Sequence, residues 1–167
     1  MGYHGIDPLA TLPHVTPIDY LITIGLSVAP VSELRGGLPF ALGRGLHPAA
    51  AYVLAVGANL LVVPILLVGF RWAESVLRRF SPTRRLLEAV LRRTRRKGRF
   101  VERFGSVGLV LLVAVPLPGT GAWTGALAAI LLGLPLRRSA VLITLGVLIA
   151  GVVVLFASLG AFHFLGL

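Results

Sequence analysis

Apolar residues in this chain come in long continuous runs, not at the regular spacing of an amphipathic element. Three runs contain no Asp, Glu, Lys or Arg, and they cover 45–70, 104–136 and 139–167. The hydrocarbon core of a bilayer is about 30 Å thick, so a helix that crosses it needs about 20 apolar residues at ~1.5 Å each. Buried core helices of soluble proteins, the alternative, are rarely as long as these runs. The runs therefore predict an integral membrane protein.

Two segments have the pattern of plain transmembrane helices. Residues 48–70 and 139–160 are apolar almost throughout. Pro48 begins the first segment, at a position where its missing N–H would be unpaired in any case. Pro64, within the same segment, is a candidate kink. We therefore predict one span from each segment.

Two further segments, 18–46 and 105–135, are apolar but interrupted. The first contains four residues that disfavour a continuous helix, namely Pro30, Gly36, Gly37 and Pro39. The second is broken in the same way over 116–121. Its charge-free run is too long for one span and too short for two spans and a turn, which need about 40 residues. We therefore predict re-entrant hairpins, each with two half-helices and a broken tip; one broken span is the alternative for 18–46.

Each half of the chain thus consists of an interrupted hairpin, a proline and a span. The spacing agrees, since the interval from Pro30 to Pro48 is almost the same as that from Pro116 to Pro135. Such internal symmetry is typical of transporters, although two Leu- and Gly-rich stretches can also look alike by chance. The predicted fold is all-α and membrane-embedded: one domain over 1–167, with inverted repeats at 18–70 and 105–160.

The positive charge of the chain lies mainly between the two repeats. The net charge is +10, and residues 71–104 hold 12 of the 16 Lys and Arg side chains. The positive-inside rule places this segment in the cytoplasm, as expected for a multi-pass protein of the plasma (inner) membrane. Both termini then lie outside. If 18–46 were one broken span, the N-terminus would lie inside.

The basic segment itself is expected to form an amphipathic helix on the cytoplasmic face. Ser81 and Pro82 fit an N-cap and a first helical position. Apolar residues recur beyond them at helical spacing, and the arginines between them are candidates to hold anionic lipid head groups: Arg84, Arg85, Arg92, Arg93 and Arg96. Alternatively, these charges only determine topology. A nucleic-acid partner is not expected.

Glu33 and Arg35 are charged residues within an otherwise apolar segment. A charge at the bilayer centre costs about 2.5–3.5 kcal/mol, so such residues usually face a cavity or a partner. We predict a substrate or proton site, with Glu33 as proton carrier and Arg35 as anchor for an anionic group. A direct pair between them needs a broken backbone, which Gly36 and Gly37, just before Pro39, would supply. A structural ion pair, or exposure at the interface, is the alternative.

The second interruption frees backbone polar groups that lipid cannot satisfy. These groups must be paired within the protein or line a wet cavity. If a half-helix starts near Gly119, its positive dipole end would stabilise an anion such as Glu33 or a phosphate head group. A tight packing turn is the alternative. The candidate site residues are Pro116, Pro118, Gly119, Thr120, Gly121, Trp123 and Thr124, with Thr120 and Thr124 on one helical face.

Asn59 is a polar residue within the span 48–70. It is a candidate to hydrogen-bond across to a hairpin, and a structural polar contact is the alternative. The chain has no cysteine, so disulfides and thiol chemistry are excluded. Its histidines are scattered and no Ser-His-Asp arrangement is suggested. We therefore expect no metal, no cofactor and no enzymatic activity.

Three strings carry a resemblance to a known family. SELRGGLPFALGRG, and FGSVGLVLLVAVPLPGTGAWTGALAAILLG with the following LGVLIAGVVV, resemble the small multidrug export proteins over roughly residues 27–160. A remoter similarity is to the DedA (SNARE-associated/VTT) superfamily, whose members have two re-entrant hairpins and are linked to proton-coupled translocation of polyprenyl phosphate and other lipids. The second hairpin here has no acid and no arginine, so only Glu33 and Arg35 match that pattern.

These observations together predict a small membrane transporter or translocase, proton-coupled, for a small amphipathic or lipid-phosphate substrate. Its partners would be membrane lipids, protons and a second copy, because so small a chain needs a homodimer to enclose a path. The alternative is a non-transporting scaffold that binds anionic lipid or a partner through its basic helix.

Overall fold

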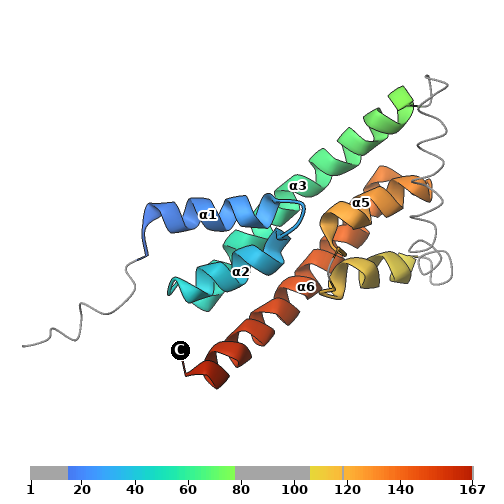
Figure 1. The fold of residues 1–167 in the computed structure, drawn as a ribbon. Helices are drawn as coiled ribbons and strands as arrows, with labels where there is room; N and C mark the ends of the chain where they lie inside the picture. The colour runs from blue at the N-terminus through green and yellow to red at the C-terminus, as the bar shows by residue number, and fades with distance from the viewer. Residues whose placement is uncertain (1–14, 78–105, 118, 167) are drawn as a thin grey trace, which may run out of the picture.

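The computed structural model describes residues 15–77, 106–117 and 119–166, and these parts of the chain are entirely helical apart from turns. Figure 1 shows two long helices with shorter helical segments packed along them. The elements are α1 (Pro17–Val28), α2 (Glu33–Gly43), α3 (Pro48–Leu77), an unlabelled helical segment over 106–114, α5 (Ala122–Leu131) and α6 (Leu136–Leu165). The prediction of an all-α fold is confirmed for the described residues.

Helices α3 and α6 form the antiparallel centre of the molecule (Figure 1). Both are long and apolar enough to cross a membrane, as predicted for 48–70 and 139–160. At ~1.5 Å per residue, 30 residues extend about 45 Å, which exceeds the ~30 Å hydrocarbon core. Helix α3 begins at Pro48, as expected, and continues through Pro64.

A glycine of α6 allows these two helices to approach closely. A Cβ atom built on Gly151 would lie 2.6 Å from Val56 Cγ2 and 2.8 Å from Tyr52 Cε2 on α3. The Tyr52 hydroxyl donates a hydrogen bond of 3.1 Å to the Leu148 carbonyl, one turn away on α6. Close packing at a small residue is the usual way in which membrane helices associate.

The first interrupted segment is a helix–turn–helix, but its break differs from the prediction. The chain turns over 29–32, at Pro30, whereas α2 runs unbroken through Gly36, Gly37 and Pro39. Gly37 serves close packing instead, because a Cβ atom there would lie 2.0 Å from Ser27 Oγ on α1. The expectation that Gly36 and Gly37 break the backbone is therefore wrong.

An ion pair ties the open end of this helical pair. Arg44 Nε lies 2.7 Å from Asp19 Oδ1, which joins the end of α2 to the start of α1. The other carboxylate oxygen of Asp19 accepts hydrogen bonds from the Thr16 backbone N–H at 2.8 Å and from its hydroxyl at 2.7 Å. Helix α1 is thus capped and held against α2 by the same acidic side chain.

The second interrupted segment also consists of two short helical pieces, 106–114 and α5, with a break over 115–117 and 119–121. Two glycines allow the helical segment 106–114 to pack closely against α5 and α6. A Cβ atom on Gly125 would lie 2.5 Å from Val113 Cγ2, and one on Gly146 would lie 2.6 Å from Val113 Cβ. Val113 is therefore held between α5 and α6. The predicted basic helix lies outside the described residues, with Arg84, Arg85, Arg92, Arg93 and Arg96, and so does Pro118.

Candidate functional site

The breaks of the two interrupted segments meet in space (Figure 1). We call residues 29–33 the first tip, and residues 115–117 and 119–121 the second tip. Glu33, only 5 % exposed, accepts a hydrogen bond of 3.2 Å at Oε1 from the Trp123 backbone N–H. Trp123 is in the first turn of α5, where backbone N–H groups lack partners within the helix and the dipole is positive. The structure thus brings Glu33 to the start of this helix, and its role in binding a proton or substrate stays a prediction.

The backbone of Glu33 is itself unusual. Its φ angle is +50°, and no other non-glycine residue in the described ranges has a positive φ. A side chain in this left-handed region costs about 1–3 kcal/mol and persists only where the surroundings hold it. The strain falls on the residue whose carboxylate joins the two tips, so this contact compensates for it.

Gly121 lies directly against the Glu33 carboxylate. A Cβ atom on Gly121 would lie 1.8 Å from Glu33 Oε2 and 2.5 Å from Cδ. Its φ of +149° and ψ of −159° are also accessible essentially to glycine alone. Only glycine at position 121 therefore permits both the turn before α5 and the close approach of the Glu33 carboxylate.

Trp123 links α5 to two further elements. Its indole Nε1–H donates a hydrogen bond of 3.1 Å to the carbonyl of Val28, the last residue of α1. Its ring meets that of Phe70 on α3 edge to face, with 6.3 Å between the ring centroids. The side chain thus reinforces the contact that its backbone makes with Glu33.

Arg35, in the first turn of α2, donates hydrogen bonds to backbone carbonyls in and next to the second tip. Its Nη2 donates to the carbonyls of Val113 at 3.3 Å and Val115 at 3.2 Å. Its Nη1 donates to the carbonyl of Leu117 at 2.8 Å and to that of Thr120. Four backbone carbonyls at or next to the interruption are therefore paired within the protein, as lipid requires.

This arrangement separates the two charged side chains. Glu33 faces the start of α5 and Arg35 faces the second tip, and no ion pair between them is found in the described part of the chain. The terminal nitrogens of Arg35 are engaged by carbonyls, while its buried Nε–H has no partner among the described residues. Arg35 as anchor for an anion stays a prediction.

The two threonines of the second segment do not share a helical face. The prediction required a helix from Gly119, but α5 begins at Ala122, after two glycines in positive-φ conformations, so Thr120 precedes the helix. The Thr120 hydroxyl can donate to the carbonyl of Val115 at 2.8 Å or of Leu117 at 2.9 Å. The Thr124 hydroxyl donates to the Gly121 carbonyl at 3.2 Å. Both hydroxyls stabilise the turn that leads into α5.

The remaining predicted site residues are more dispersed. Asn59 on α3 is 2 % exposed, and its amide nitrogen has no hydrogen-bond partner within the described ranges, so the expected bond to a hairpin is not seen there. Gly36 packs at the first turn of α2, because a Cβ atom there would lie 2.7 Å from Ser32 Cβ. Gly119 is exposed in the second tip, with φ +72°.

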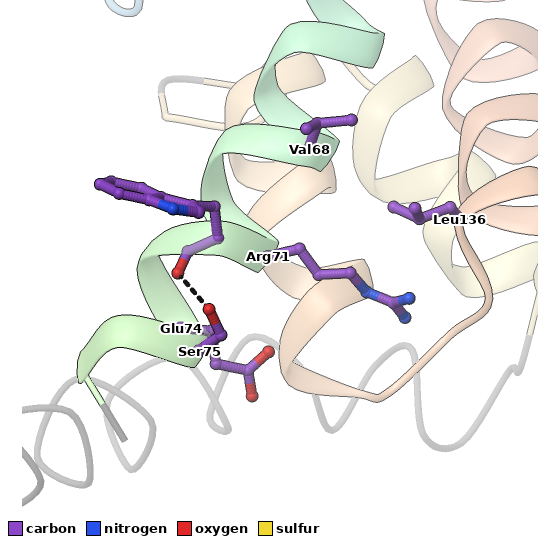
Figure 2. Close-up of a pocket in the computed structure, with 6 residues that line it drawn as sticks. Val68, Arg71, Glu74, Ser75 and Leu136 are labelled. Carbon is purple, nitrogen blue, oxygen red and sulfur yellow. Dashed lines mark hydrogen bonds between the residues drawn. The ribbon is translucent and has the colours of Figure 1, made fainter. Parts of the chain in front are cut away.

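Two cavities lie at opposite ends of α6. The α2–α6 cavity, about 400 Å³, is lined by Arg35, Pro39, Pro116, Val154, Ala157, Ser158, Ala161 and Phe162. The α3–α6 cavity, about 490 Å³, is lined by Val68, Arg71, Trp72, Glu74, Ser75 and Leu136 (Figure 2). Figure 2 shows Arg71 extending from α3, and its Nη2 donates to the Leu134 carbonyl at 3.2 Å. Sequence reasoning missed the α3–α6 cavity, although Arg71 and Trp72 directly follow the predicted span 48–70.

Comparison with known proteins identifies one family. The model of the family described as "Putative small multi-drug export protein" matches residues 33–153, which include Glu33, Arg35 and the whole second tip. No curated protein and no solved structure matches the chain. The first family resemblance seen in the sequence is therefore confirmed, whereas the remoter similarity to the DedA superfamily stays a prediction.

Proposed function

The chain belongs to the "Putative small multi-drug export protein" family, and we propose that it is a small membrane transporter whose path passes the contact between the two tips. The observation that carries this proposal is the buried Glu33 carboxylate, which is held at the start of α5. Buried ionisable side chains at membrane depth commonly mark substrate or proton pathways.

The separation of the two cavities supports a path across a bilayer. Leu136 lines one cavity and Val154 lines the other, and the helical rise of ~1.5 Å per residue separates them by about 27 Å along α6. This distance is close to the ~30 Å thickness of the hydrocarbon core. If α3 and α6 span the membrane, each cavity opens toward a different side.

We propose that the tip contact lies between these cavities along α6. Val113, whose carbonyl accepts a hydrogen bond from Arg35, packs on Gly146, which lies between Leu136 and Val154 in α6. An ionised Glu33 is attracted by the positive end of α5, and a protonated one loses that attraction. Proton binding at Glu33 would therefore loosen the contact and couple proton movement to opening of the path.

The short helices support the re-entrant arrangement. Helix α1 has 12 residues, about 18 Å, and α5 has 10 residues, about 15 Å, so neither crosses a ~30 Å core alone. We propose that 18–46 and 105–135 enter and leave on one side each, as inverted repeats. The basic segment 71–104 would then be cytoplasmic and both termini outside, with a second copy completing the enclosure of a small amphipathic or lipid-phosphate substrate.

Flux in proteoliposomes tests this function. Two probes are loaded, ethidium as a cation and anilinonaphthalene sulfonate as an anion, and a pH gradient is imposed. We expect the protein to accelerate movement of at least one probe, and Glu33→Gln to reduce it to the protein-free level. Glutamine keeps an oxygen that accepts from the Trp123 N–H but cannot carry a proton.

Asp19→Asn is the matched control, because it neutralises a buried acid away from the tips. Flux in this variant should keep its dependence on the pH gradient. Absence of flux for both probes, or equal flux in wild type and Glu33→Gln, would overturn the proposal. The scaffold alternative depends on residues 92–96, which lie outside the described ranges; it predicts that charge reversal there matters and that Glu33 does not.

A further inference from the structure

The α2–α6 cavity is an open, mostly apolar hollow in the surface that is large enough for a small molecule. Its volume of about 400 Å³ falls within the ~300–1,000 Å³ typical of pockets that hold small ligands. Apolar side chains from three elements form most of the wall, with Pro39 from α2, Pro116 from the second tip and Phe162 from α6. These side chains provide a surface on which an apolar molecular body can pack.

Arg35 is the one charged side chain among the described residues that line this cavity. Arg35 contributes a permanent positive charge. Its terminal N–H groups already donate to backbone carbonyls, so its attraction for an anionic group is electrostatic. The Ser158 hydroxyl donates to the Val154 carbonyl at 2.7 Å, so it has acceptor capacity left but no free proton. No carboxylate is among the lining residues in the described part of the chain, and Glu33 faces α5 instead.

The α3–α6 cavity differs in this respect, because both Arg71 and Glu74 line it. Charges of both signs provide no preference for cations or anions there. Selection by charge would therefore occur in the α2–α6 cavity, where a cation would be repelled by Arg35 without a compensating acid.

We propose that the α2–α6 cavity binds amphipathic molecules with an apolar body and an uncharged or anionic polar end, and that it discriminates against organic cations. The apolar body packs on Val154, Ala157 and Phe162, and the polar end is directed toward Arg35. The place of this cavity on a transport path rests on the proposed function, but the binding preference does not.

The absence of cysteine in the natural chain makes a direct test available. Ser158→Cys places one thiol in the α2–α6 cavity with little change in volume, and Ala157→Cys is a second reporter. Each variant is reconstituted in nanodiscs and reacted with N-ethylmaleimide, alone, with anilinonaphthalene sulfonate, or with tetraphenylphosphonium. Ser75→Cys, in the α3–α6 cavity, controls for effects of the probes on the bilayer.

We expect the sulfonate, at about nine times its Kd, to slow labelling of both α2–α6 reporters about tenfold, the factor 1 + [L]/Kd. Tetraphenylphosphonium should leave their labelling unchanged, and neither probe should protect Ser75→Cys. Protection by the cation equal to that by the sulfonate, or no protection by either, would overturn the proposal. Labelling needs no flux, so its outcome is distinguishable from failure of the transport proposal.

Discussion

The carboxylate of Glu33 rests against the backbone of Gly121, so closely that a Cβ atom on Gly121 would fall 1.8 Å from Oε2. The two residues belong to different interrupted segments, and each has a backbone conformation that is unfavourable for ordinary side chains. Their contact joins the two tips at the middle of the molecule.

Gly121→Ala should destabilise the protein by about 1–3 kcal/mol or more, because alanine is strained at this φ and its methyl group would displace Glu33. Thermal unfolding in detergent, followed by tryptophan emission, measures the loss. Gly133→Ala is the matched control: it also imposes a side chain at positive φ, but into open space, so its effect should be smaller.

The same position allows a coupling experiment. In the double variant Gly121→Ala/Glu33→Ala, the methyl group no longer meets a carboxylate, so the two effects should be less than additive. Strict additivity would show that the two side chains do not share one contact.

Arg35→Lys should loosen the second tip although the charge is kept. Lysine has three donors on one nitrogen and cannot reach four carbonyls as the planar guanidinium does. We expect faster amide hydrogen exchange over 115–121. Arg44→Lys is the control, since Arg44 pairs, among the described residues, only with the carboxylate of Asp19. If Arg44→Lys speeds amide exchange over 115–121 as much as Arg35→Lys does, the role given to Arg35 is contradicted.

Gly151→Ala should weaken the packing of α6 on α3 by about 1–3 kcal/mol, because its methyl group would overlap the Val56 and Tyr52 side chains. Gly160→Ala, on the same helix with open space around it, should be neutral or slightly stabilising, as alanine favours a helix over glycine by about 0.5–1 kcal/mol. Denaturant unfolding of the two variants compares them, and a larger loss at Gly160 would refute the assignment.

Trp123→Phe should cost about 1 kcal/mol, since the ring remains beside Phe70 but the hydrogen bond to the Val28 carbonyl is lost. The chain has two tryptophans, so the matched variant Trp72→Phe, whose side chain is 69 % exposed, leaves Trp123 as the only emitter. We expect the Trp123→Phe variant to have the lower unfolding midpoint when each variant is followed by its remaining tryptophan.

Hydropathy was sufficient to predict the two long helices, because burial in lipid acts within a single stretch of sequence. Proline did not locate the first break by itself, since the chain turns at Pro30 but α2 continues through Pro39. Glycine was ambiguous. Gly37 was interpreted as a helix breaker, whereas it permits the approach of α1, and Gly121 both ends a turn and receives a carboxylate. The sequence does not distinguish a glycine that breaks a helix from one that permits close packing, because the difference depends on the residues that lie beside it in space.

The sequence by itself determined that the chain is a membrane protein of helices, that two segments are interrupted, and that Glu33 and Arg35 are charges in need of partners. It also indicated that the N-terminus of the second half-helix in 105–135 could stabilise an anion such as Glu33. Only the tertiary structure decided the rest: Arg35 pairs with backbone carbonyls of the second interrupted segment instead of Glu33, and cavities form near the two ends of α6. The physical reason is that hydropathy acts locally along the chain, whereas the partners of a buried charge come from whichever distant segment packing brings beside it.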